Sequence, residues 1–88
     1  MEQDSIKVYG ASWCGDCYRA KMILDNYHMS YQCIDIDQAP SGKEFIREVN
    51  HGDLVVPTIV FGDGSILSEP SNRELKNKVE QEIKSRYA

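Results

Sequence analysis

In the stretch Ile6-Lys7-Val8-Tyr9-Gly10-Ala11-Ser12-Trp13-Cys14-Gly15-Asp16-Cys17, a short apolar run leads into a closely spaced pair of cysteines. The run predicts a strand over Ile6–Tyr9, and the helical spacing of apolar residues beyond Cys14 predicts a helix to about Tyr27. The first cysteine then lies where free backbone N–H groups and the helix dipole favour a thiolate. Thiols in that position react near neutral pH. The stretch therefore predicts a redox pair, although the spacing alone also suits half of a metal site.

Size and composition predict one small soluble domain spanning residues 1–88. The hydrophobic fraction of 41% and the charged fraction of 27% are ordinary for a globular protein. No apolar run approaches the ~18 residues that span a bilayer, so we expect no membrane partner. The net charge of −4 disfavours a nucleic-acid partner, for which a basic face would be expected.

Cysteine usage and the N-terminus predict the compartment. Met1-Glu2-Gln3-Asp4 lacks the basic and apolar regions of a signal peptide, so we expect a cytoplasmic protein. A Cys-x-x-Cys pair is seldom a structural disulfide there. Three cysteines also cannot form a disulfide framework without leaving one unpaired.

Three further strands are predicted, over residues 31–35, 58–61 and 65–67. The first of these is rich in β-branched and aromatic residues, and Gly62-Asp63-Gly64 is a turn signal that joins the other two as a hairpin. Pro57 precedes the third strand of the chain. Because proline cannot donate to a sheet ladder, it must lie at a strand start, an edge or a bulge.

Two capping-box patterns predict where the later helices begin. Ser41-Gly42-Lys43-Glu44 would start a second helix that Gly52 ends in a left-handed turn. Ser71-Asn72-Arg73-Glu74 would start the last helix. The predicted order is β-α-β-α-β-β-α, an α/β fold with a four-stranded mixed sheet and helices on both faces. The cysteine pair then follows the carboxyl end of the first strand, where open α/β sheets place their sites.

Segments along nearly the whole chain resemble the glutaredoxins of the thioredoxin superfamily, most closely their mycoredoxin-like branch. The matching segments are Ser12-Trp13-Cys14-Gly15-Asp16-Cys17, Asp35-Ile36-Asp37, Val49-Asn50-His51-Gly52, Val56-Pro57-Thr58-Ile59-Val60-Phe61, Asp63-Gly64-Ser65 and Glu69-Pro70-Ser71. The resemblance implies a thioredoxin fold with a cis Val56–Pro57 bond packed against the cysteine pair. The exposed backbone of Val56 would then pair with an extended substrate.

The resemblance also implies a thiol–disulfide oxidoreductase that reduces protein disulfides or mixed disulfides. Cys14 would be the nucleophile, and Cys17 would resolve the mixed disulfide or stay a spectator while a low-molecular-weight thiol does so. Trp13 would form the lip of the groove, and Pro57 would shape its floor and keep a competing metal ligand away from the sulfurs.

The same resemblance implies a site for the thiol co-substrate at the start of the last helix. Ser71 and Asn72 would offer N–H groups to a carboxylate of the bound thiol, although helix capping alone explains Ser71. Two departures from the glutathione-binding pattern weaken recognition of glutathione. Ala11 stands where such proteins commonly have lysine, and Ser68-Glu69-Pro70-Ser71-Asn72 replaces a Gly-Gly-x-Asp-Asp-like segment.

The resemblance implies particular electron donors and substrates. The electron donor would be glutathione, mycothiol, a bacillithiol-like thiol or a protein of the thioredoxin-reductase type. The substrates would be disulfide-containing or S-thiolated proteins. We expect no tightly bound cofactor, no metal ligands in the resting site, and a monomer.

Asp16, inside the motif, and three residues outside it have simple physical interpretations. Asp16 suits the helix dipole but opposes thiolate formation at Cys14. Cys33 is expected to be a buried strand cysteine that acts as a small hydrophobe. His28 is predicted to end the first helix in a left-handed conformation, and His51 to lie in a turn before Gly52.

Three alternatives stay open at this stage. A dimer could bridge an iron–sulfur cluster through Cys14 and two external thiols, which Gly15 in place of proline makes more permissible. Cys14, Cys17 and Cys33 with a histidine could hold zinc, although no second close-spaced pair accompanies them. A redox-dead adaptor is disfavoured because both cysteines of the motif are retained.

Overall fold

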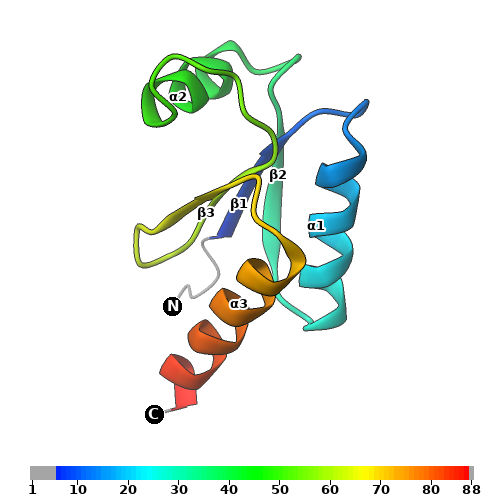
Figure 1. Ribbon diagram of the computed structural model, residues 1–88, viewed down its shortest axis with the longest axis vertical. Coiled ribbons are helices and arrows are strands. Elements are labelled where there is room, and N and C mark those ends of the chain that lie inside the picture. The colour runs from blue at the N-terminus through cyan, green and yellow to red at the C-terminus, as the bar shows by residue number, and fades with distance from the viewer. Residues whose placement is uncertain (1–5, 88) are drawn as a thin grey trace.

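Residues 6–87, the part of the chain that the computed structural model describes, follow the predicted order of elements (Figure 1). The elements are β1 (Ile6–Gly10), α1 (Gly15–Asn26), β2 (Tyr31–Asp35), α2 (Pro40–Val49), β3 (Thr58–Val60), β4 (Ile66–Ser68) and α3 (Asn72–Tyr87). The predicted α/β fold class is thereby confirmed. The acidic segment Met1–Asp4, on which the expectation about a signal peptide rests, lies outside the described residues.

The four strands form one mixed sheet in the order β2-β1-β3-β4. β1 is parallel to β2, with Val8 beside Cys33, and antiparallel to β3, with Val8 beside Ile59. β3 and β4 are antiparallel, as the hairpin signal predicted. β1 therefore lies inside the sheet, and its carboxyl end leads directly to the cysteine pair.

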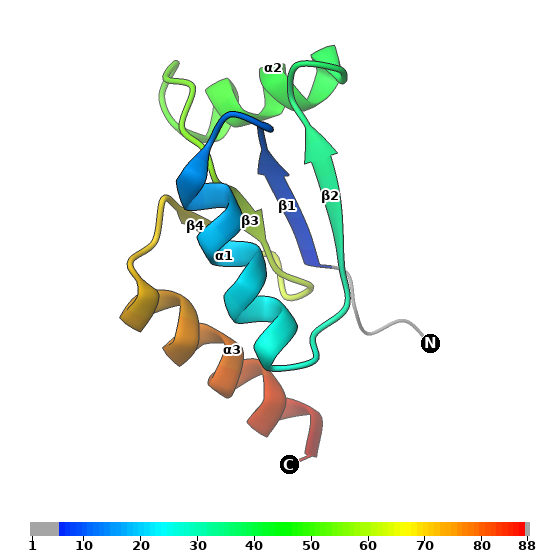
Figure 2. The ribbon, with the colours of Figure 1, turned by 90° about the vertical axis from the view of Figure 1, so that its right-hand side faces the viewer.

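Helices α1 and α3 lie side by side on one face of the sheet (Figure 2). They enclose the main core, which includes Val8, Leu24, Ile59 and Leu75. No helix in the described part of the chain is long and apolar enough to cross a membrane.

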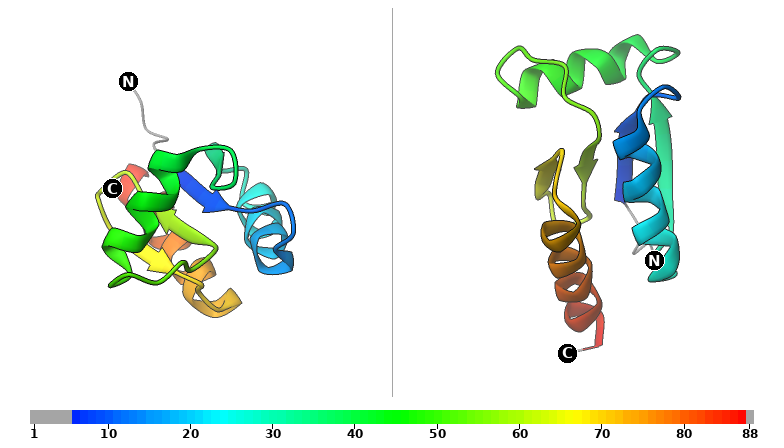
Figure 3. Two further views of the ribbon diagram at one scale, coloured as in Figure 1. Left: turned by 90° about the horizontal axis from the view of Figure 1, so that it is seen from above. Right: turned by 45° about the vertical axis from the view of Figure 1, so that its right-hand side comes forward.

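Helix α2 lies across the top of the molecule, over the opposite face of the sheet (Figure 3). The rings of Tyr9 and Phe45 are 4.9 Å apart, and a Cβ on Gly42 would come within 3.1 Å of Ile34. A second, smaller core cluster contains Ile46 with Ala11 and Ile36. The predicted helices on both faces are therefore present.

The two predicted capping boxes have different outcomes. At α3 the box is present, because the Glu74 N–H donates to Ser71 Oγ at 3.1 Å and the Ser71 N–H donates to the Glu74 carboxylate at 2.9 Å. At α2 the prediction is wrong. That helix begins two residues earlier, with Pro40 in its first turn and Ala39 rather than Ser41 as N-cap, and no side chain caps it. Proline suits the first helical position because its missing N–H would be unpaired there, and its φ is already helical.

The predicted helix ends are confirmed by backbone conformation. His28 follows α1 with φ of 58°, and Gly52 follows α2 with φ of 96°. His51, next to it, is also left-handed with φ of 57°, in an exposed turn. The Gly52 N–H donates to the carbonyl of Arg47 at 2.7 Å, which closes the end of α2.

We predict that Gly10→Ala destabilises the protein by about 1–3 kcal/mol, because the added methyl must displace a buried side chain. A Cβ at Gly10 would lie 2.8 Å from Cys17 Sγ, whereas a Cβ at Gly15 would have nothing within 4 Å. Gly15→Ala is therefore the matched control and should cause no loss. Chemical denaturation of both variants measures the free energies of unfolding. Equal values for the two variants would refute the close-approach explanation.

Candidate active site

The turn between β1 and α1 holds Cys14 at the start of the helix. The Cys14 N–H donates to the carbonyl of Ala11 at 3.1 Å, and Cys14 is the N-cap residue rather than part of the helix. Its sulfur accepts a hydrogen bond from the Cys17 N–H at 3.2 Å. The backbone donor and the positive end of the helix dipole both favour negative charge on this sulfur.

Cys17 lies one turn further along α1 and is only 1% exposed. Burial raises the pKa of the Cys17 thiol to about 12, and the hydrogen bond to Cys14 and the charge on Cys14 act in the same direction. Desolvation penalises a thiolate in an apolar setting. The two cysteines therefore differ in setting: Cys14 is half-exposed at the start of the helix, and Cys17 is a buried thiol whose raised pKa keeps it protonated.

The Val56–Pro57 bond is cis, as the family resemblance implied. The carbonyl oxygen of Val56 lies 3.9 Å from Cys14 Sγ, and Pro57 is buried immediately before β3. Within residues 6–87, the N–H of Val56 has no hydrogen-bond partner. The backbone of Val56 therefore lies beside the Cys14 sulfur through its carbonyl oxygen.

A groove of about 520 Å³ opens beside Cys14. Its lining residues are Trp13, Cys14, Gly15, Asp16, Leu54, Val55, Val56 and Glu69. Of the predicted site residues, the structure brings Trp13, Cys14 and Val56 together here, whereas Cys17, Pro57, Ser71 and Asn72 are outside the lining. Leu54 and Val55 were missed, since neither belongs to a periodic pattern or a catalytic residue type.

Trp13 is held in place although its side chain is 68% exposed. Its indole N–H donates to the carboxylate of Asp37 at 3.0 Å, and the Asp37 N–H donates to the Asp35 carboxylate at 2.9 Å. Asp37 was not predicted as a site residue. Its position in the segment Asp35-Ile36-Asp37 was the available signal.

Arg19 links the first turn of α1 to the start of α3. Its guanidinium lies 3.4 Å from the Asp16 carboxylate and donates to the Asn72 side-chain oxygen and to the carbonyl of Pro70. Part of the negative charge of Asp16 is therefore offset by a neighbouring cation. The Ser71 N–H is already bonded to Glu74 in the capping box, so the role of Ser71 and Asn72 in thiol binding stays a prediction.

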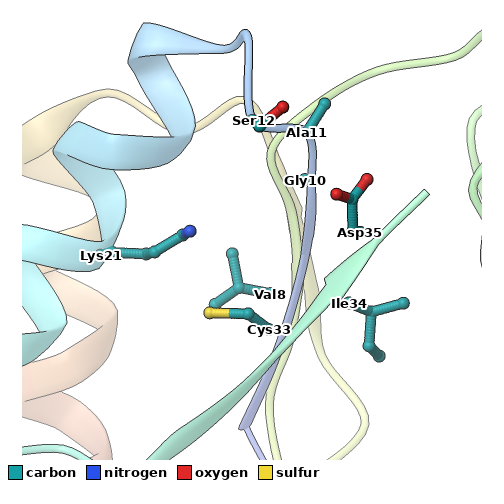
Figure 4. Close-up of a pocket in the computed structure, with 8 residues that line it drawn as sticks. All are labelled: Val8, Gly10, Ala11, Ser12, Lys21, Cys33, Ile34 and Asp35. Carbon is teal, nitrogen blue, oxygen red and sulfur yellow. The ribbon is translucent and has the colours of Figure 1, made fainter. Parts of the chain in front are cut away.

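The prediction that Cys33 is buried is wrong, because this cysteine is exposed. β2 is an edge strand, and the main contacts of α1 with the sheet are made to β1. Cys33 borders a hollow of about 250 Å³ together with Val8 and Lys21. Figure 4 shows Lys21 reaching from α1 toward the strands, with Cys33 on the same side as Val8 and Ile34 on the opposite side.

The possible zinc ligands named above, Cys14, Cys17 and Cys33 with a histidine, do not come together in the described part of the chain. Among them, no group of three or more His, Cys, Asp and Glu side chains is placed to hold a metal ion.

Sequence comparison relates the chain to redox proteins of actinobacteria. Residues 6–66 match the glutaredoxin family. A Mycobacterium tuberculosis protein named as a glutaredoxin is 40% identical over 75 residues, which covers 85% of this chain and 89% of the relative. Mycoredoxin 1 of Corynebacterium glutamicum is 32% identical over 76 residues, which covers 86% of this chain and 94% of the relative.

Solved structures share the architecture. The glutaredoxin-like NrdH-redoxin of Escherichia coli superposes with a TM-score of 0.71 at 22% identity, covering 83% of this chain and 92% of that one. A buckwheat glutaredoxin in complex with glutathione gives a TM-score of 0.68 at 23% identity, covering 89% of this chain and 72% of that one. At these identities the likeness establishes the thioredoxin-like fold.

We predict that alkylation of the reduced protein distinguishes the three cysteines. With the pKa of Cys17 at about 12, only about one Cys17 thiol in a thousand is ionised at about pH 9. Iodoacetamide should therefore modify Cys14 and the exposed Cys33 but leave Cys17 intact in the folded protein. Peptide mapping by mass spectrometry gives the modified sites, and unfolding in denaturant should release Cys17. Modification of Cys17 in the folded protein as fast as Cys33 would contradict the burial argument.

Proposed function

The chain belongs to the glutaredoxin family of redox proteins, and we propose that it reduces disulfides by thiol–disulfide exchange at Cys14 and Cys17. The substrates are protein disulfides or mixed disulfides between a protein and a low-molecular-weight thiol. The observation that carries the proposal is the asymmetry of the pair, in which Cys14 caps a helix beside a groove while Cys17 is buried.

In the first step the Cys14 thiolate attacks one sulfur of the substrate disulfide. A bond forms between Cys14 Sγ and that sulfur, the substrate S–S bond breaks, and the other sulfur leaves as a thiolate that takes up a proton. The hydrogen bond from the Cys17 N–H to Cys14 Sγ supports the nucleophile before the attack.

The second step has two routes. Cys17 can lose its proton and attack Cys14 Sγ, which releases the reduced substrate and leaves a Cys14–Cys17 disulfide. Alternatively, an external thiol attacks the sulfur bonded to Cys14 and regenerates the Cys14 thiolate. In the resting protein the Cys14 charge and hydrogen bond help to raise the pKa of Cys17. Mixed-disulfide formation removes both contributions, so the first route becomes easier at the point where it is needed.

The groove supplies the binding interactions. The N–H of Val56, without a partner in the described residues, suits pairing with the backbone of an extended substrate. Pro57, which is buried and outside the lining, would hold the Val56 backbone in position, and the exposed ring of Trp13 would form the lip. Ser71 and Asn72, at the adjoining start of α3, are the proposed contacts for the thiol co-substrate, and a carboxylate of that thiol would displace Glu74 from the Ser71 N–H.

The electron donor that fits this site is a low-molecular-weight thiol such as glutathione, mycothiol or a bacillithiol-like compound, or a protein of the thioredoxin-reductase type. The partners are disulfide-containing or S-thiolated proteins, met by a monomer in the reducing cytoplasm. Turnover compared across these four donors identifies the physiological class.

A cluster-bridging dimer is the second candidate, favoured by open space beside Gly15. A Cβ at Gly15 would meet nothing within 4 Å, so a bulky group could be accommodated next to Cys14. Each protomer would contribute Cys14, with two external thiols completing the ligand set. A visible absorption band after anaerobic purification in the presence of that thiol would support this candidate over a plain reductase.

We predict that Cys14→Ser abolishes reduction of both protein disulfides and mixed disulfides, since Cys14 carries the only sulfur among the eight residues described as lining the groove. Cys17→Ser should lose most activity on protein disulfides but keep activity on mixed disulfides, for which an external thiol completes the cycle. Coupled steady-state assays on an insulin-type disulfide and on an S-thiolated peptide measure the two activities. Cys33→Ser is the matched control and should retain both. Activity of Cys14→Ser above background would contradict the assignment of the nucleophile.

A further inference from the structure

We propose that the groove beside Cys14 selects cationic partners, namely an extended peptide with lysine or arginine next to its disulfide-bonded cysteine. This inference rests on the proposed function, because it names the substrate class of the same site. The determinants are Asp16 and Glu69.

The charges that line the groove are all of one sign. Apart from the Cys14 thiol, the only ionisable side chains among its eight lining residues are Asp16 and Glu69. No lysine, arginine or histidine belongs to the lining. A cleft with charge of one sign raises the local concentration of partners with the opposite charge and repels partners with the same charge.

Arg19, the basic residue nearest to Asp16 in the sequence, does not make the charge of the groove positive. Arg19 lies 3.4 Å from Asp16 and is also bonded to the Asn72 side chain and the Pro70 carbonyl. These contacts direct it toward the start of α3. Arg19 offsets part of the charge of Asp16, and none of the ion pairs among the described residues includes Glu69.

A backbone hydrogen bond holds Glu69 at the rim of the groove. Its N–H donates to the carbonyl of Pro57 at 2.7 Å, so it lies next to the Val56 backbone that would pair with the substrate. Its φ of 50° is left-handed, a conformation that glycine adopts more readily. The side chain is exposed, so packing in the core does not account for a carboxylate at this position.

The helix end that could receive an anion already holds one. At the start of α3, the carboxylate of Glu74 accepts the Ser71 N–H at 2.9 Å. A carboxylate on an incoming thiol would have to displace Glu74 and would also face Asp16 and Glu69. Anionic partners are therefore disfavoured at this groove.

The apolar part of the groove suits the stem of a long basic side chain. Trp13 is 68% exposed and Leu54 is 42% exposed. The methylene groups of lysine or arginine pack on such surfaces while the charged head stays in water, and a cation near the indole face gains a further attraction. These two surfaces favour lysine or arginine over a compact cation.

The test uses three symmetrical disulfides, each made from two copies of a capped tripeptide with cysteine between two lysines, two glutamines or two glutamates. The Cys17→Ser variant stops the reaction at the mixed disulfide on Cys14. The rate constant for that step is measured by rapid quenching and peptide mapping. The quantity of interest is the ratio of the rate constants for the lysine and glutamate peptides. Comparing this ratio between variants cancels the intrinsic reactivities of the peptides.

We expect Glu69→Gln in this background to lower the lysine-to-glutamate ratio by about fivefold at ~0.1 M salt. Glu69→Gly, which also suits the left-handed φ, should lower it equally. At about 1 M salt the Debye length is about 3 Å, so the difference between the variants should vanish.

The matched control is Glu80→Gln, which removes one charge from α3 and can still accept from Tyr27, its partner at 2.7 Å. Tyr27 follows the far end of α1, about 20 Å along the helix from Cys14, so the ratio should not change. An unchanged ratio in both Glu69 variants, or faster reaction of the glutamate peptide with the unsubstituted groove, would overturn the inference. Failure of all three peptides to react at Cys14 would instead overturn the proposed function.

Discussion

The close approach between Gly10 at the end of β1 and Cys17 in the first turn of α1 is the constraint on which the site depends. A side chain at residue 10 would begin 2.8 Å from Cys17 Sγ, so glycine allows the helix to start directly against the strand. Cys17 is thereby buried and kept as a thiol, because burial raises its pKa to about 12. Cys14, three residues earlier, is left at the helix end, where the Cys17 N–H donates to its sulfur. One backbone contact therefore gives the two cysteines different chemistry.

Reactivity and selectivity come from different parts of the chain. The reactive sulfur depends on β1 and α1, whereas the groove beside it is completed by the loop before β3 and the link between β4 and α3. The bond from the Glu69 N–H to the Pro57 carbonyl joins these two segments. Arg19 connects both regions through Asp16 and Pro70. In the proposed function, residues such as Glu69 can therefore change partner choice while the arrangement of Cys14 and Cys17 stays the same.

Features set by neighbouring residues could be predicted from the sequence. The strand Tyr31–Asp35 and the capping box at Ser71 depend on residues close in the chain, and both are present. The capping box predicted at Ser41 is absent because Pro40 occupies the first turn of α2. The exposure of Cys33 could not be predicted, since it depends on which strand α1 covers. The place of Leu54 in the groove and the hydrogen bond from Trp13 to Asp37 could not be predicted from the sequence either. Both depend on loops that come together only in the folded chain.

The central claim is that Cys14 reacts first and that Cys17 acts only afterwards. Its most direct test is a time course in which the reduced wild-type protein is mixed with a limiting amount of a disulfide substrate. Samples quenched with acid are mapped to find the order in which the sulfurs become bonded. A mixed disulfide on Cys14 should appear first and then be replaced by a Cys14–Cys17 disulfide or be released by added thiol. A first bond at Cys17 or at Cys33 would contradict the central claim.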